Sequence, residues 1–241
     1  MSESWKDAGE NDRLFDDRES LFAALAMEVT VRLNDAVAAR GRASLVATGG
    51  TTPGPLYDAL SAEPAPWDRV EITLTDERWV APDSDDSNEG LVRRRLLRDR
   101  AAGAELIGLK TRDATPAEAE AKVDRALAGM IRPFDVTVLG MGEDGHIASL
   151  FPHAPELTRA MRAGPTSLVC AVDRPEAPGS AARMSMTVPA LLGSRWIVIL
   201  IEGQGKLDMV RQAREPGDAA DLPVRTVLGQ SDTPVEVWWA P

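Results

Sequence analysis

A glycine-rich segment of the chain places an aspartate and a histidine two residues apart. Asp144 and His146 lie in residues 140–146, which have the sequence GMGEDGH. An imidazole exchanges protons near neutral pH, so this residue type suits general acid–base catalysis. His146 is one of only two histidines in the chain. We therefore expect a catalytic pair here, in which the two side chains either contact each other or both face a substrate.

The residues before this segment predict the element that positions the pair. Residues 136–139 (VTVL) form an apolar, β-branched run typical of a buried strand. Glycines at positions 140, 142 and 145 predict a sharp turn where that strand ends. In open α/β sheets, ligands bind just beyond the carboxyl ends of the strands. The plain alternative is a glycine turn with a capping aspartate and a surface histidine.

The same glycines match the G-x-G-x-x-G pattern of dinucleotide-binding proteins, which is a weak signal alone. That pattern expects an acidic residue about 20 positions later to hold the ribose. Residues 162–167 (RAGPTS) contain none. Glu143 and Asp144 would also repel a pyrophosphate, so we do not expect a dinucleotide cofactor.

A second glycine-rich turn has the composition of a phosphate cradle. Gly49, Gly50, Thr51 and Thr52 follow a predicted strand over residues 43–48 and precede a short helix. Backbone N–H groups at a helix N-terminus favour anions. The segment lacks the Gly-Lys-Ser/Thr of a Walker loop. A tight turn with a capping threonine explains the local sequence equally well.

Polar and charged residues follow other predicted strands. Asp76 and Arg78 come directly after a strand over residues 70–75, and Asn88 lies in the next polar loop. Arg183 begins a short strand that leads to a helical turn, and Lys206 lies at a strand-to-helix turn. Each feature alone also fits an ordinary surface cluster. The arginine-rich helix predicted over residues 89–101 is interpreted as a solvated face.

Composition limits the class of protein and its partners. The 241 residues are 44% hydrophobic and 27% charged, which is typical of a globular protein. No apolar run approaches the ~20 residues of a membrane span, and the N-terminus does not resemble a signal peptide. A single cysteine fits a reducing cytoplasm. The net charge of −11 argues against nucleic acid or an anionic membrane as partner, and any anionic ligand would need a local cationic cluster.

Strand and helix patterns alternate along the chain, which predicts a three-layer α/β fold. We expect a mostly parallel, Rossmann-like sheet with helices on both faces. Residues 1–19 are expected to be a flexible lead-in, and residues 20–241 a single domain. The first helix is predicted from a cap at Ser20 to Gly41. Its core-facing stripe consists of Leu21, Leu25, Val29 and Leu33.

Taken together, the blocks at 49–53, 76–88, 140–152 and 183–206 resemble the 6-phosphogluconolactonase family, in order and spacing, over about residues 20–239. The resemblance implies the fold of the phosphosugar isomerases and deaminases. It implies hydrolysis of 6-phospho-D-glucono-1,5-lactone to 6-phosphogluconate in the oxidative pentose phosphate pathway. A lactone is an activated ester, so neither a metal nor a cofactor is expected.

The resemblance also suggests roles for individual residues. His146 would be the base that activates water, and Asp144 would orient it or hold the water. Backbone N–H groups of the 140–145 turn, including Gly142, would stabilise the oxyanion. The phosphate is assigned to Arg78, Lys206 and the 49–52 loop, with Arg183 as a further candidate. Asp76 and Asn88 would hold sugar hydroxyls or organise their loop, and His153 is expected on the surface.

Two rival functions belong to related proteins. Glucosamine-6-phosphate deaminases usually have a glutamate in the corresponding Asp-Gly-His segment where this chain has Phe151, which cannot exchange a proton. Some transcription regulators use a related domain as a phosphosugar sensor, but no basic recognition helix is evident here. The chain also departs from the lactonase pattern after its last strand, so a contribution of residues 237–241 (VWWAP) to the site is left open.

Overall fold

The computed structural model describes residues 12–174 and 180–241 and contains two β-sheets. The strands of the large sheet are β1 (Arg13–Leu14), β2 (Ala43–Ala47), β3 (Val70–Leu74), β5 (Glu105–Leu106), β6 (Val136–Gly140), β9 (Ile197–Glu202) and β10 (Val235–Ala240). Their order is β1-β10-β9-β6-β2-β3-β5, and every pair is parallel. The predicted parallel sheet is therefore confirmed.

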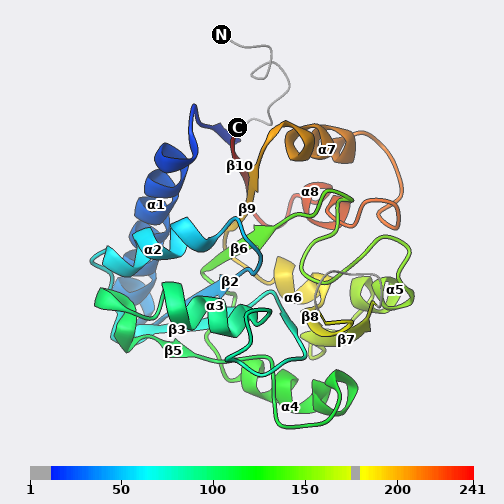
Figure 1. Ribbon diagram of the computed structural model, residues 1–241, viewed down its shortest axis with the longest axis horizontal. Helices are drawn as coiled ribbons and strands as arrows, with labels where there is room; N and C mark the ends of the chain where they lie inside the picture. The colour runs from blue at the N-terminus through cyan, green and yellow to red at the C-terminus, as the bar shows by residue number, and fades with distance from the viewer. Residues whose placement is uncertain (1–11, 175–179) are drawn as a thin grey trace.

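Helices cover both faces of this sheet. They are α1 (Arg18–Arg40), α2 (Gly54–Ala62), α3 (Asn88–Arg95), α4 (Pro116–Ala128), α5 (Pro155–Met161), α6 (Val188–Leu192), α7 (Gln204–Arg214) and α8 (Arg225–Leu228), with 3₁₀ turns at Trp67–Arg69 and Asp99–Gly103. Figure 1 shows α1 and α2 on one side of the strands, and α7 and α8 on the other. The expected three-layer α/β arrangement is confirmed.

A small second sheet was not anticipated from the sequence. It consists of β4 (Asp76–Arg78), β8 (Ala182–Met186) and β7 (Val169–Asp173) in that order, with antiparallel pairing throughout. The short strand β4 follows β3 after one residue and leaves the large sheet to pair with β8. Because β4 changes sheet, Asp76 and Arg78 lie beside residues of β8 and not beside the strands of the large sheet.

The N-terminal boundary differs from the expectation. Asp17, not Ser20, caps α1: its carboxylate accepts a hydrogen bond of 2.7 Å from the Ser20 N–H. Arg13 and Leu14 pair with β10, so the flexible lead-in expected over residues 1–19 is wrong from residue 12 onward. Residues 1–11 lie outside the described part of the chain. The C-terminal prediction is confirmed, because Gly41 ends the helix at a φ of 77° that favours glycine.

The predicted stripe of α1 lies in the core. Leu21, Leu25, Val29 and Leu33 are all fully buried. These residues form the apolar face of α1, and the helix contacts β2, β6 and β10 of the central sheet. The outward face of this 23-residue helix contains charged side chains together with the exposed Met27 and Val31. Among the helices of the described ranges, none combines the length and apolar character needed to cross a membrane.

In the arginine-rich segment after β4, the helix is shorter than expected and two of the arginines form ion pairs. The helix predicted over residues 89–101 ends at Arg95. Arg95 and Arg98 both pair with the Asp58 carboxylate of α2, and the Arg98 contact measures 2.9 Å. These two arginines therefore attach the α3 region to α2 instead of forming only a solvated face.

Candidate active site

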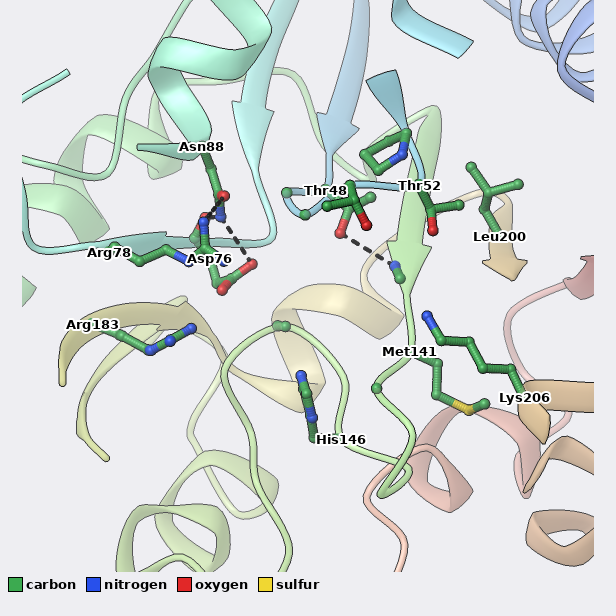
Figure 2. A pocket seen from close by; sticks show the side chains of 17 residues that line it. Thr48, Thr52, Asp76, Arg78, Asn88, Met141, His146, Arg183, Leu200 and Lys206 are labelled. Carbon is green, nitrogen blue, oxygen red and sulfur yellow. Dashed lines mark hydrogen bonds between the residues drawn. The ribbon is translucent and has the colours of Figure 1, made fainter. Parts of the chain in front are cut away.

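A cavity of about 200 Å³ lies where the two sheets meet, over the carboxyl ends of the adjacent strands β2, β6 and β9. Figure 2 shows its wall. The lining residues are Thr48, Gly49, Gly50, Thr51, Thr52, Pro53, Asp76, Arg78, Asn88, Gly140, Met141, Gly142, His146, Ala148, Arg183, Leu200 and Lys206. Eleven of the twelve residues singled out in the sequence are in this set, and only Asp144 is outside it.

Asp144 lies behind His146 and contacts it directly. The carboxylate Oδ1 is 2.6 Å from the imidazole Nδ1 and also accepts the His146 backbone N–H at 3.1 Å. The hydrogen bond with His146 lowers the pKa of Asp144 below its ordinary value, so the carboxylate is ionised at neutral pH. With Nδ1 occupied, Nε2 is the ring nitrogen available to a ligand, and Figure 2 shows the ring directed into the cavity. Of the two arrangements left open by the sequence, direct contact is the one observed.

Gly142 is required by the close approach of this pair. A Cβ at position 142 would lie 2.2 Å from the His146 ring and 2.8 Å from the Asp144 carboxylate. Backbone of the turn therefore packs against the imidazole, and any side chain would displace the ring. A glycine is therefore needed at position 142 for steric reasons, independently of any contact with a ligand.

The three glycine N–H groups of the turn are already in use. Gly140 donates to Thr48 Oγ1 at 3.2 Å, Gly142 to the His146 carbonyl at 2.9 Å, and Gly145 to the Gly142 carbonyl at 3.2 Å. These bonds hold the turn in shape. These three amides are therefore occupied in this conformation, and the expectation that other N–H groups of residues 140–145 stabilise an oxyanion stays a prediction.

Two arginines lie opposite each other on neighbouring strands of the small sheet. Arg78 of β4 and Arg183 of β8 are direct partners in the antiparallel pairing. Like charges in this position destabilise a sheet unless an anion offsets their repulsion. Arg183 is only 4% exposed, and burial lowers its pKa from the ordinary guanidinium value. Arg78 donates to the Asn88 side-chain oxygen and to the Asp86 carbonyl, both at 2.8 Å. This part of the cavity wall therefore contains two neighbouring guanidinium groups.

Lys206 contributes a third cation from the opposite side of the cavity. It lies in the first turn of α7, and Figure 2 shows its side chain extending toward Thr52 and Thr48. Across the ranges 12–174 and 180–241, its ammonium group has no hydrogen-bond or ion-pair partner. Because α7 directs its N-terminus to the same place, the helix dipole adds to the attraction for an anion.

The C-terminal strand supports Lys206 without lining the cavity. The indole N–H of Trp239 donates to the Gly203 carbonyl at 2.8 Å, and the Gly203 N–H donates to the Ala240 carbonyl at 2.9 Å. Gly203 has a φ of 81° and begins the turn that leads to Lys206. The last strand, β10, is therefore connected to the site through the backbone of the Gly203 turn.

The 49–52 loop leaves its backbone donors available. Within the described residues, the N–H groups of Gly49, Gly50, Thr51 and Thr52 donate to no protein acceptor. The alternative of a capping threonine is wrong, because Pro53 caps α2 with no side-chain bond and the Thr52 hydroxyl donates to Glu202 at 3.1 Å. A Cβ at Gly49 would lie 1.9 Å from the Asn88 side-chain oxygen. Backbone N–H groups without protein acceptors in such a loop suit an anion.

Glu77 organises the site but was missed in the sequence. Its fully buried carboxylate accepts hydrogen bonds of 2.7 to 3.0 Å from the backbone N–H groups of residues 78, 88 and 89 and from the Ser87 hydroxyl. It thereby joins the strand of Arg78 to the start of α3, where Asn88 lies. The sequence did contain a signal, because Glu77 lies between Asp76 and Arg78, two residues that we expected in the site.

Phe151 packs against His146. Its ring centroid lies 4.5 Å from that of His146, and the side chain is 5% exposed. The Arg183 guanidinium lies 5.5 Å from the same ring. A carboxylate at this position would sit between His146 and Arg183, whereas the phenyl ring fills that space with apolar contacts. As expected, His153 lies apart from the site and is mostly exposed, 3.3 Å from Asp221.

Fold and cavity together define a three-layer α/β protein whose pocket combines three cationic side chains with an Asp–His pair. The chain belongs to the family described as glucosamine-6-phosphate isomerases/6-phosphogluconolactonase, whose model matches residues 16–239. It is 38% identical to the 6-phosphogluconolactonase of Rhizobium meliloti, over 96% of this chain and 99% of that protein. It is 41% identical to the 6-phosphogluconolactonase of Pseudomonas aeruginosa, over 90% and 89% respectively.

Solved structures show the same architecture. The 6-phosphogluconolactonase from Shewanella baltica is 42% identical and superposes with a TM-score of 0.93, over 97% of this chain and 98% of that one. A monomeric glucosamine-6-phosphate deaminase is 17% identical, with a TM-score of 0.75 over 95% and 97% of the chains. The second likeness shows the fold alone. Since both kinds of protein share the fold, the fold does not discriminate between their reactions.

Proposed function

We propose that this protein is a 6-phosphogluconolactonase, which hydrolyses 6-phospho-D-glucono-1,5-lactone to 6-phosphogluconate. The observation that carries the proposal is the pair of an Asp144-bound His146 ring and a cationic wall in one cavity. A phosphorylated lactone offers the complementary groups, a carbonyl carbon at one end and a phosphate at the other. The names of the similar proteins from Rhizobium meliloti and Pseudomonas aeruginosa support the same substrate.

His146 acts as general base and then as general acid. Its Nε2 takes a proton from water as the oxygen attacks the lactone carbonyl, and a tetrahedral oxyanion forms. The intermediate collapses by breaking the bond to the ring oxygen, and the imidazolium returns its proton to that oxygen. Asp144 holds Nδ1–H and stabilises the positive ring between the two steps. A positioned acid–base group contributes about 10²–10⁴-fold to such a rate.

The cationic wall holds the phosphate away from the reacting carbon. Arg78, Arg183 and Lys206 supply charge, and the amides of the 49–52 loop supply hydrogen bonds. Asp76, on the same wall, accepts hydrogen bonds from sugar hydroxyls. Asn88 organises the wall, because its amide donates to the Asp76 carbonyl and accepts from Arg78, both at 2.8 Å. Binding the phosphate at a fixed place orients the carbonyl toward His146, so the water attacks a substrate that is already aligned.

The proposal includes a place in the cell. We assign the reaction to the cytoplasm, as a step of the oxidative pentose phosphate pathway, with the sugar-phosphate lactone as the small-molecule partner. The net charge of −11 supports the absence of nucleic acid and anionic membrane partners. The single cysteine, Cys170, is buried, and burial raises its pKa to about 12, so the thiol is unreactive.

A coupled assay with freshly generated lactone tests the proposal. The parent protein should form 6-phosphogluconate well above the spontaneous rate and should release no ammonia from glucosamine 6-phosphate. His146→Ala should lower kcat by roughly 10²–10⁴-fold with a small change in KM, because the ring is lost and the cationic wall remains. His153→Ala is the matched control and should keep the parental rate. Parental turnover by His146→Ala, or ammonia release by the parent, would contradict the assignment.

A further inference from the structure

One buried serine connects the two halves of the cavity. Ser149 is fully buried, and its hydroxyl donates to Asp76 Oδ2 at 2.6 Å across 73 positions of sequence. Its backbone N–H donates to Ser185 Oγ of β8 at 3.2 Å. Ser149 follows His146 by three residues, whereas Asp76 and Ser185 both belong to the small sheet. This side chain therefore joins the loop of the general base to the sheet that carries the arginines.

The residue before it has a strained backbone. Ala148 has a φ of +50°, a region that residues with a side chain rarely adopt, and it lines the cavity. Such a conformation persists only where the surroundings hold it in place. The bridge between Met141 and Ile147 holds it on one side, and the two hydrogen bonds of Ser149 hold it on the other.

We propose that Ser149 is a positioning residue for lactone hydrolysis. Its hydrogen bond to Asp76 sets the separation between His146, on the large-sheet side, and the wall that binds the sugar phosphate. Ser149 lines no part of the cavity, so it acts through the placement of the two neighbouring groups. The inference rests on the proposed function, because it assigns a role within that reaction.

Thr75 offers a matched comparison on the same carboxylate. Its hydroxyl donates to the other oxygen, Asp76 Oδ1, at 3.1 Å, and it is also fully buried. Thr75 immediately precedes Asp76, and its hydroxyl also lies within 3.4 Å of Thr48 Oγ1. Within the described residues, its side chain donates no hydrogen bond to residues 146–150. Ser149→Ala and Thr75→Val therefore each remove one hydroxyl donor from Asp76, but only the first disconnects the loop from the small sheet.

Kinetics and the imidazole NMR signals together test the role. Ser149→Ala should lower kcat by roughly 10–100-fold, since a misplacement of about 1 Å has an effect of that size, and should change KM less. Thr75→Val should alter KM while kcat stays within about threefold. The chain has two histidines, so the His146 ring signals should shift in Ser149→Ala while those of His153 serve as an internal reference. Thr75→Val should leave both sets in place.

Parental kcat and unmoved His146 signals in Ser149→Ala would overturn the role. Equal effects of the two variants would also overturn it, because the loss would then come from the Asp76 carboxylate itself. If Ser149→Ala does not fold, Ser149→Cys keeps a weak donor and should give an intermediate kcat, and a parental kcat would refute the link. A parent without lactonase activity would refute the proposed function alone, since the NMR comparison still decides whether Ser149 positions His146.

Discussion

At the scale of single residues, the chemistry depends on the direction in which one imidazole faces. Asp144 occupies Nδ1 and lies outside the cavity wall, so the carboxylate orients His146, whose ring lies on that wall. Gly142 leaves room for this contact because it has no Cβ. Phe151 supports the far side of the ring. The base is thus held by a hydrogen bond and by packing at once.

Asp144→Asn should lower kcat by roughly 10²–10⁴-fold and leave KM nearly unchanged, because a neutral amide stabilises the imidazolium far less. Steady-state kinetics on the lactone measures this. Glu143→Gln, an exposed carboxylate in the same turn, is the control and should have little effect. A rise in KM at parental kcat would place Asp144 in contact with substrate instead.

At the scale of elements, the small sheet must be fixed to the large one for the site to exist. Helix α4 holds the small sheet in place through its contacts with β7 and β8, and Glu120 provides part of this attachment. The carboxylate accepts the Ala171 N–H of β7 at 2.6 Å and hydrogen bonds of 2.7 and 3.0 Å from Arg159. Burial raises the pKa of Glu120, but the bonds from Arg159 and Ala171 outweigh this and hold it below its ordinary value.

A carboxylate with a lowered pKa stabilises the folded state above its unfolded pKa, and this contribution is lost as the pH falls through the folded pKa. Glu120→Gln should therefore lower the free energy of unfolding at pH 7 by about 1 kcal/mol, a modest figure because the partner Arg159 is half exposed. The difference from the parent should shrink below about pH 4. Urea unfolding from pH 3 to 8 measures it, with Glu105→Gln, on the exposed edge strand, as control. A difference that is constant with pH would contradict the linkage.

At the scale of the whole molecule, an acidic protein concentrates cations at one place. The net charge is −11, yet the cavity wall contains Arg78, Arg183 and Lys206 against one carboxylate, Asp76. The two arginines oppose each other only because β4 leaves the parallel sheet and pairs with β8. Burial of Arg183 and its repulsion from Arg78 disfavour the charged side chain, Asp76 offsets part of this cost, and a bound phosphate would offset more of it.

Arg183→Met should leave the ligand-free protein at least as stable as the parent and should weaken phosphate binding. Without ligand, the free energy of unfolding should be unchanged or raised by up to roughly 1 kcal/mol, because a buried charge is replaced by an apolar side chain. For the parent, 6-phosphogluconate at 100 times its Kd should add about 2.7 kcal/mol, and the variant should lose most of this gain. Thermal unfolding with and without the ligand measures both, with the exposed Arg112→Met as control. Full stabilisation of Arg183→Met by the ligand would place the phosphate elsewhere.

Local patterns in the sequence determined much of the fold and most of the site. Apolar β-branched runs and glycine turns predicted the parallel strands, and polar residues after those runs identified eleven side chains or backbone positions of the cavity wall. These signals are readable because a strand end, a capped helix or a glycine turn depends on a few neighbouring residues.

Only the tertiary structure decided how these pieces meet. The second sheet, the opposition of Arg78 and Arg183, and the bond between Ser149 and Asp76 join residues far apart in the chain, and no local pattern encodes such pairings. Three of the N–H groups in the 140–145 turn, those of its glycines, are occupied because the turn uses them to hold its own shape. Residue types and their order identify which groups are present, but packing between distant segments determines which of them face the substrate.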